Sequence, residues 1–358
     1  MNDASNKGWS RLAPLSVLVV EDSAFIRSVL VGALRTVGVG TVHAAKSGAD
    51  AIRFFEERNA ALPPGASPVD VVITDIVMPE VDGLMLLRWI RSSPKSPDKF
   101  LPVLMLSGAA DRHYVEQARD LGATDFLAKP FSAHTVSSRL MLAIARPRRF
   151  VLANGYFGPD RRRTAKPVQM DCRMTSDPEI LVVHSQSKSV GIDRYPVVYF
   201  ELPNRLGAKA GIGPRDPVPV LPESLLEAAE AEIQSRAGDY ATWIVGEVEE
   251  MARRIDRLGA DPRHVAGLIG EINRSAHEMR GQGGIFGYPL ITHVAKSLYE
   301  ATSGGLKTVT PNEQLLCKAH VDAIKAVMHG HISGYGGVTG QQLLASLDVA
   351  KKKYAKAA

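Results

Sequence analysis

The stretch VDVVITDIVMPEVDG, Val69 to Gly83, joins a continuously apolar run to one aspartate and then to a loop containing proline and glycine. A short apolar run is typical of a strand buried on both faces, as in a parallel sheet. Asp75 is predicted to end this strand, and Pro79 and Gly83 are predicted to fix an exposed turn after it. The pattern therefore places a carboxylate where a buried strand opens to solvent.

Further apolar runs lie on both sides of this stretch, and an amphipathic helical stretch follows each. The runs are VLVV (17–20), TVHAA (41–45), LPVLMLS (101–107) and TDFLAK (124–129), and the helices begin near Ser23, Ser47, Asp82, Asp111 and Ser132. Several of these serines and aspartates stand where helix N-caps are expected. Five βα units predict an α/β doubly wound domain with a five-stranded parallel sheet over residues 16–145.

The remaining chain differs in pattern on each side of this domain. Residues 1–15 are expected to be disordered. Residues 146–222 are basic and rich in Pro and Gly, with strand-like patches at VQMDCRM, EILVVHS and PVVYFE, and are either a linker or a small β module. Residues 223–358 predict an all-α helical bundle. Its helices are expected at Glu223–Arg236, Asp239–Leu258, Pro262–Gly281, Tyr288–Thr302, Pro311–His331 and Gly340–Ala355.

Composition and residue pattern argue against a secreted, a membrane-spanning and a disulfide-rich protein. The 45% hydrophobic and 23% charged content describes a globular chain. No signal peptide and no membrane-spanning run is recognisable, so we expect a cytoplasmic protein without membrane insertion. Cys172 and Cys317 lie far apart, which fits neither a zinc site nor a disulfide framework.

The positive charge is concentrated in one segment. Between Arg146 and Lys166 the sequence contains seven basic residues and a single acidic residue, Asp160. We interpret this segment as a solvated linker in preference to a phosphate or nucleic-acid contact.

Polar side chains stand at the predicted carboxyl ends of four strands, where open parallel sheets bind ligands. They are Glu21, Asp22, Asp75, Ser107 and Lys129. Three carboxylates close together would raise one another's pKa unless a cation joined them, and such oxygen ligands suit Mg²⁺. Asp75 could then attack phosphorus while Lys129 and Ser107 stabilise the transferring group. The loop EDSAFIR contains no glycine-rich nucleotide fingerprint.

At these residues the chain resembles a response-regulator receiver domain, through VEDS, DIVMPEVDG and AKPF. The resemblance implies a flavodoxin-like fold, phosphorylation at Asp75, and Mg²⁺ held by Glu21, Asp22, Asp75 and the backbone carbonyl of Val77. It makes Ser107 and Phe126 the switch pair, and Lys129 and Pro130 the pair joined by a cis peptide bond.

Two further expectations follow from the resemblance. Phe126 stands where many members carry tyrosine, so a phenolic switch is unavailable. Val77 and Ala109 are apolar and offer little help to an attacking water, so we expect a long-lived aspartyl phosphate.

A second chemical motif is SAHEMRGQGGIFG, Ser275 to Gly287, in the predicted bundle. Residues three, four and seven apart share a helix face, so Arg280, Gly281 and Gly284 lie beside His277. Arg280 would favour a phosphoryl group on the imidazole, and Gly281 and Gly284 would leave docking space for a partner. The other nine histidines have no acid or cysteine partner that completes a metal site.

This motif resembles the histidine-containing phosphotransfer (HPt) domain, most closely the version in chemotaxis histidine kinases. The resemblance is strongest over Asp261 to Glu300 and makes His277 the phosphoacceptor, with Arg280 in place of a usual lysine. No ATP-binding kinase motif is present, so the chain is expected to be a phosphotransfer protein and not a kinase.

Three functions are therefore compared. The first is a phosphorelay protein whose partners are a sensor histidine kinase and other receiver or HPt proteins. The second is a binding or scaffold protein in which the receiver gates target binding and His277 transfers nothing. The third, nucleic-acid binding through Arg161 to Lys166, is not expected because no recognition helix or stacking pattern supports it.

Overall fold

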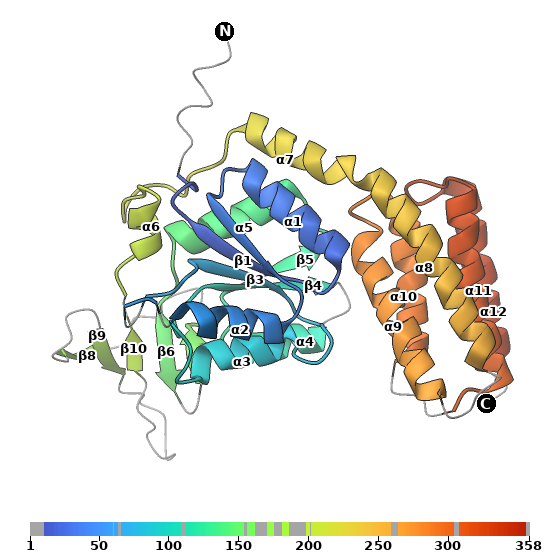
Figure 1. Cartoon of the computed structure of the whole chain (residues 1–358), viewed down its shortest axis with the longest axis horizontal. Coiled ribbons are helices and arrows are strands. Elements are labelled where there is room, and N and C mark those ends of the chain that lie inside the picture. The colour runs from blue at the N-terminus through green and yellow to red at the C-terminus, as the bar shows by residue number, and fades with distance from the viewer. Residues whose placement is uncertain are drawn as a thin grey trace, which may run out of the picture. The chain divides into compact units, whose positions relative to one another are not determined.

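Five βα units follow one another in the computed structural model of the chain (Figure 1). The structure describes residues 11–59, 61–63, 66–108, 112–153, 156–161, 170–174, 181–185, 198–200, 202–258, 264–303 and 308–355. The strands are β1 Ser16–Val20, β2 Thr41–Ala45, β3 Val71–Asp75, β4 Val103–Gly108 and β5 Asp125–Lys129. The helices are α1 Ala24–Thr36, α2 Gly48–Asn59, α3 Gly83–Ser92, α4 Arg112–Asp120 and α5 Ala133–Ala145.

The five strands form one parallel sheet in the order β2-β1-β3-β4-β5, which confirms the predicted fold. Helices α1 and α5 cover one face, and α2, α3 and α4 cover the other (Figure 1). Alternate residues of each strand point to opposite faces, so Leu18 and Val20 join the core beneath α2 and α3. Val17 and Val19 are equally buried on the other face.

Side-chain caps begin three of these helices at the predicted residues. Ser23 accepts a hydrogen bond from the backbone N–H of Ile26, and Asp82 accepts one from Met85. Ser132 forms a reciprocal capping box with Thr135. Because a cap satisfies backbone N–H groups that lack a partner within the helix, it fixes where each loop at the carboxyl end of the sheet becomes helical.

The prediction that residues 1–15 are disordered is wrong for residues 11–15. Leu12 and Leu15 are each 1% exposed. The backbone N–H of Gly40 donates to the carbonyl of Leu12, and a Cβ on Gly40 would lie 1.8 Å from the carbonyl oxygen of Ala13. Two buried leucines therefore anchor this turn to the start of the sheet. Residues 1–10 lie outside the described part of the chain.

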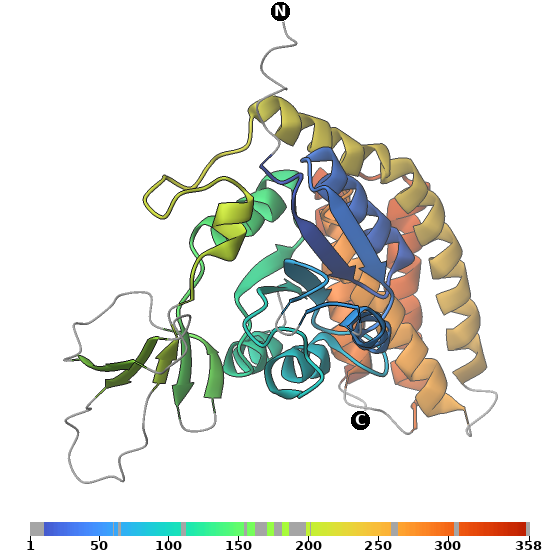
Figure 2. The same ribbon diagram turned by 60° about the vertical axis from the view of Figure 1, so that its left-hand side comes forward.

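A second, antiparallel sheet follows α5 (Figures 1 and 2). Its strands are β6 Phe150–Ala153, β7 Tyr156–Pro159, β8 Met170–Met174, β9 Leu181–Ser185 and β10 Val198–Phe200, in the order β7-β6-β10-β9-β8. Residues 146–222 therefore contain a small β module, one of the two predicted alternatives. The patches predicted from sequence correspond to β8, β9 and β10, whereas β6 and β7 are additional.

Aromatic packing joins the small sheet to the α/β domain. Phe100, in the loop before β4, lies 5.1 Å from Phe150, 5.3 Å from Phe157 and 5.5 Å from Phe200, measured between ring centroids. Arg91 of α3 is 5% exposed and stacks its guanidinium over the Phe150 ring at 5.1 Å. The small sheet is thus attached through a cluster of rings, of which Phe150 is buried and the other three are half-buried.

The interpretation of residues 146–166 as a linker is wrong for residues 150–159, which form β6 and β7, whereas the exposed side chains of Arg146 and Arg161 agree with a solvated segment. Three of its arginines also make contacts within the first unit. Arg146 donates to the carbonyls of Pro214 and Asp216, Arg148 donates to those of Thr124 and Asp160, and Arg161 pairs with Asp120 at 3.1 Å. A planar guanidinium with five donors can satisfy several carbonyls at once, which explains why these side chains fold back. Arg162, Arg163 and Lys166 lie outside the described residues.

Helices occupy the rest of the chain. They are α6 Arg205–Lys209, α7 Glu223–Ser235, α8 Ala237–Leu258, α9 Val265–Gln282, α10 Pro289–Thr302, α11 Pro311–His329 and α12 Gly337–Ala355. Helix α9 packs against α8 and α10, and α11 packs against α8 and α10, so four helices close into a bundle, with α12 packed on α11. Its core includes Tyr240, Ile272, Val294 and Ile324, each 0% exposed.

The chain divides into two compact units, residues 1–232 and 233–358. The division lies within α7, and the second unit begins ten residues after the predicted start of the bundle, so most of α7 belongs to the first unit. No helix among the described residues is both long and apolar enough to cross a membrane.

Candidate functional site

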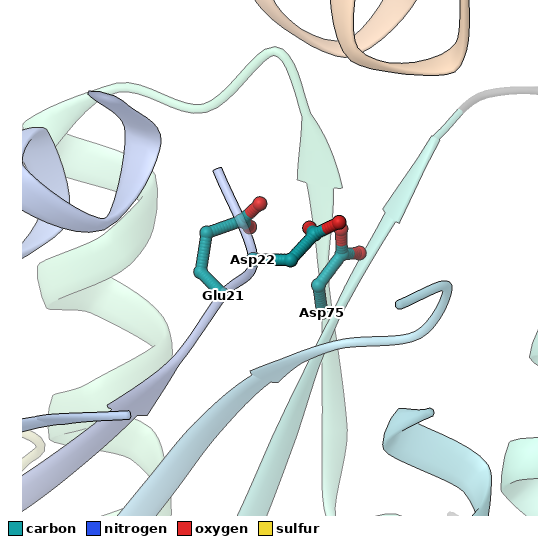
Figure 3. A group of neighbouring side chains, drawn as sticks. All are labelled: Glu21, Asp22 and Asp75. Carbon is teal, nitrogen blue, oxygen red and sulfur yellow. The ribbon is translucent and has the colours of Figure 1, made fainter. Parts of the chain in front are cut away.

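Three carboxylates meet at the carboxyl end of the parallel sheet (Figure 3). Glu21 and Asp22 follow β1, and Asp75 is the last residue of β3. One oxygen from each lies within 4.8 Å of the others. Glu21 is 2% and Asp75 is 3% exposed, so water solvates these two charges poorly. The sequence predicted this juxtaposition, because β1 and β3 are adjacent parallel strands.

Lys129 at the end of β5 reaches across the site. Its Nζ lies 2.7 Å from Asp75 Oδ2 and 3.0 Å from Glu21 Oε2, and the side chain is nearly as buried as its partners. The following bond, Lys129–Pro130, is cis as predicted. One ammonium therefore faces two buried carboxylates, with Asp22 as a third acid nearby.

Burial and mutual repulsion shape the ionisation of this cluster. Burial and, to a smaller extent, the charge of Asp75 raise the pKa of Glu21 to about 8, against the opposing effect of Lys129. Burial and the charge of Asp75 also raise the pKa of Asp22. Burial alone lowers the pKa of Lys129, but Asp75 and Glu21 outweigh it, so the net direction is upward. The set carries more negative charge than one lysine neutralises, and its oxygen donors suit a divalent cation such as Mg²⁺.

The loop after Asp75 is tightly constrained. The backbone N–H of Ile76 donates to Asp75 Oδ1 at 2.8 Å, and that of Gly83 donates to the Ile76 carbonyl at 3.0 Å. Glu80 has a φ of 62°, which is uncommon for a residue with a side chain. Val77 in this loop is half-buried. These contacts hold the carboxylate of Asp75 in one orientation.

The predicted switch residues lie on the two neighbouring strands. Ser107 is 7% exposed near the end of β4, one residue beyond Leu106, which is the partner of Asp75 in the sheet. Phe126 is half-buried on β5 and packs against the core beneath α2 and α3. The switching roles of Ser107, Phe126 and Pro130 stay predictions. Ala109 lies outside the described residues.

His277 lies on α9, in the second unit, as predicted. Its ring is half-buried, 5.4 Å from the ring of Tyr299 on α10. Arg280 stacks its guanidinium over the same tyrosine at 4.5 Å and contacts His277 Nδ1 at 3.1 Å. Because a guanidinium can only donate, Nδ1 accepts this bond and the neutral ring carries its proton on Nε2.

Tyr299 was missed by the sequence reasoning. It is distant from His277 in the chain, and only the packing of α10 on α9 brings the two rings together. The aromatic face holds Arg280 by a cation–π contact, so the cation next to His277 is held in place by packing.

The structure explains why two of the residues in the glycine cluster after His277 are glycines. A Cβ on Gly283 would lie 2.7 Å from the carbonyl oxygen of Tyr288 and 2.8 Å from the hydroxyl of Thr292, so the start of α10 needs a glycine there. Gly287 has a φ of 82°, which favours glycine. Gly281 is buried and Gly284 is half-buried, and their predicted docking role stays a prediction.

Comparison with known proteins concerns the first domain. Residues 17–141 match the family described as "Response regulator receiver domain". The transcriptional regulatory protein PdtaR of Mycobacterium tuberculosis is 33% identical over 142 residues, which cover 40% of this chain and 62% of PdtaR. Chemotaxis protein CheY-3 of Vibrio cholerae is 29% identical over 126 residues, 35% of this chain and 88% of CheY-3.

Among solved structures, a response regulator receiver domain protein from Clostridium thermocellum is 30% identical with a TM-score of 0.32, covering 37% of this chain and 95% of that one. The chain spans about three fifths of the length of the first curated relatives that it matches.

Proposed function

We propose that the chain is a two-component phosphorelay protein, because residues 17–141 match the response regulator receiver domain family. Asp75 accepts a phosphoryl group with Mg²⁺, and His277 of an HPt bundle carries or relays phosphoryl groups to or from receiver domains. A sensor histidine kinase and other receiver or HPt proteins are its partners. The observation that carries the proposal is the cluster of Glu21, Asp22 and Asp75, the first and last of them buried, with Lys129 across it.

At the first site, an Asp75 oxygen attacks the phosphorus of a donor phosphohistidine. The P–N bond breaks, a P–O bond forms, and the departing imidazole takes up a proton. Lys129 is positioned to donate to the phosphoryl oxygens from its place beside Asp75, and Ser107 can donate a further hydrogen bond. Mg²⁺, held by the three carboxylates and the Val77 carbonyl, would neutralise charge on the transferring group.

Loss of the phosphoryl group from Asp75 is slow in this proposal. Val77 and Ala109 carry apolar side chains that cannot orient a water for attack on phosphorus. A half-time of seconds for the purified phosphoprotein would contradict this part.

At the second site, Nδ1 of His277 attacks an aspartyl phosphate once Arg280 has turned its hydrogen bond from Nδ1 to the incoming phosphoryl oxygens. The P–O bond to the carboxylate breaks, a P–N bond forms, and a ring proton is released. Arg280 supports this step because its charge is already fixed beside the ring. We propose that the chain acts in the cytoplasm as a phosphotransfer protein, without kinase activity and without nucleic-acid binding.

One contact favours the alternative function, a phosphorylation-switched binding or scaffold protein. Glu230 of α7 accepts a hydrogen bond from the backbone N–H of Ala133 at 2.9 Å. Ala133 begins α5, three residues after Pro130, so a shift at Lys129 can change a contact of the helix that leads into the bundle. In this alternative the receiver gates target binding and His277 transfers nothing.

The test follows phosphoryl transfer with labelled acetyl phosphate and Mg²⁺. Wild-type protein is expected to carry label on Asp75, stable to acid and sensitive to hydroxylamine. It is also expected to carry label on His277 that is lost in acid, either from its own Asp75 or from an added receiver. Asp75→Asn removes the first label and His277→Gln the second. The exposed residues Asp120 and His329 supply the matched controls, Asp120→Asn and His329→Gln.

The outcomes separate the two functions. Label on Asp75 but none on His277, from any receiver tried, would remove the relay and leave the switch. Absence of label on Asp75 in wild type, with Mg²⁺ present, would contradict both.

A further inference from the structure

A cavity of about 730 Å³ lies at the amino ends of the parallel strands, in the first unit. It is lined by residues that precede β4 and β5, by the start of β6 and by the segment around α6. The phosphorylation site lies at the other edge of the sheet, beyond the carboxyl ends of the strands. The volume of the cavity is typical of sites that bind small organic molecules.

One wall of this cavity is apolar and aromatic. Phe100 and Phe150 meet edge to face at 5.1 Å, and Leu202 and Leu206 line the cavity from the α6 segment. Leu202 is 36% exposed and presents apolar surface at this wall. A ring system placed here would bury apolar surface on both sides.

The polar lining carries more cations than acids, and one cation is rigidly held. Arg148 donates to the Thr124 carbonyl at 3.3 Å and to the carbonyl of Asp160. Within the described part of the chain neither Arg148 nor Lys99 pairs with a carboxylate. Asp70 already pairs with Lys209 at 2.7 Å, and Asp98 accepts from the backbone N–H of Phe100. The uncompensated charge at this wall is positive.

We propose that this cavity binds a small organic anion with a ring system, its rings between Phe100, Phe150 and Leu202, and its carboxylate or phosphate at Arg148. The site is built by both sheets, because Phe100 comes from the α/β domain and Arg148 and Phe150 from the segment that begins the small sheet. Occupancy therefore strengthens the attachment of the small sheet to the receiver domain. The proposal does not depend on phosphotransfer at Asp75 or His277.

The test uses 8-anilinonaphthalene-1-sulfonate, an aromatic sulfonate, as a fluorescent probe of the full chain. One probe per chain is expected to bind in a saturable manner. Arg148→Gln is expected to weaken binding about tenfold, the worth of one charge-assisted hydrogen bond. Leu202→Trp fills the cavity and is expected to weaken it at least as much. Arg88→Gln removes an exposed arginine on α3 away from the cavity and serves as the matched control.

Two competitors identify the acidic group. 1-Naphthoate offers a carboxylate on an aromatic ring, and adenosine monophosphate offers a phosphate. The proposal is supported if either competitor displaces the probe from the wild-type protein but not from the cavity variants. The competitor that displaces it better shows whether the site prefers a carboxylate or a phosphate. Unchanged probe affinity in Leu202→Trp, equal weakening in Arg88→Gln, or failure of both competitors would overturn it.

Discussion

Gly83 packs directly against the backbone carbonyl of Asp75. A Cβ on Gly83 would lie 2.0 Å from that oxygen, far closer than two such atoms can approach. The close approach lets α3 begin immediately beside the loop that follows Asp75, where Asp82 caps the helix. Side-chain volume at position 83 is therefore expected to disturb Asp75 itself.

Gly83→Ala is expected to destabilise the receiver domain by about 3 kcal/mol, the upper range for overpacking a core, and to reduce labelling of Asp75. Gly246→Ala provides the control of opposite sign. Gly246 is exposed within α8, and a Cβ there would have no neighbouring atom within 4 Å, so alanine should stabilise the helix by about 1 kcal/mol. Urea unfolding measures both. If Gly83→Ala changed the free energy of unfolding as little as Gly246→Ala does, the loop after Asp75 would be able to move aside for the added methyl group, and this prediction would be wrong.

Removal of Lys129 is expected to be costly because it leaves Asp75 and Glu21 buried without their cation. Lys129→Met should destabilise the receiver domain by about 3 kcal/mol, as for other broken buried ion pairs. Lys95 pairs with Glu56 at the surface at 2.9 Å, and Lys95→Met should cost less than about 1 kcal/mol. Urea unfolding at constant pH compares the two. A loss for Lys129→Met no larger than for Lys95→Met would contradict the buried pairing.

Attachment of the small sheet is expected to depend on Phe100, which contacts three rings of that sheet. Phe100→Ala should cost about 2 kcal/mol, less than a fully buried phenylalanine because Phe100 is half-buried. Hydrogen exchange should become faster in β6 and β10 while β1 to β5 keep their protection. Phe54→Ala, in α2, is the control that should leave β6 unchanged. Unaltered exchange in β6 of Phe100→Ala would mean that other contacts hold the sheet.

Stability of the bundle is expected to fall in mild acid because of His320. The side chain is 0% exposed, and its Nδ1 donates to the Leu316 carbonyl at 2.7 Å while Nε2 contacts the Ser297 hydroxyl at 2.9 Å. Burial lowers the pKa of His320 below its usual 6.5. The unfolded chain therefore takes up a proton first, so this contribution is complete above about pH 6.5 and is lost as pH falls towards the depressed pKa.

Hydrogen exchange of α11 amides between pH 7.5 and 5.5, corrected for intrinsic rates, measures this loss. His320→Gln should flatten the dependence, whereas the exposed variant His329→Gln should keep it. The same slope in His320→Gln as in wild type would assign the effect to another group.

Local signals predicted the α/β domain well. The continuous apolar run before Asp75 and the caps Ser23, Asp82 and Ser132 act within a few residues of where they stand. The strands β6 and β7 were missed because each has only four residues, too few for a periodic pattern. The dipeptide Asn154-Gly155 between them is a hairpin signal that could have revealed them.

The sequence by itself determined which residues could do chemistry: carboxylates and a lysine at strand ends, and a histidine followed by an arginine one turn later. Those assignments need only the period of a strand or a helix. Tertiary structure alone decided what surrounds them, since Tyr299 reaches Arg280 only through helix packing and Arg148 finds carbonyls only where two sheets meet. Contacts between residues distant in the chain depend on packed shape, which no local pattern encodes.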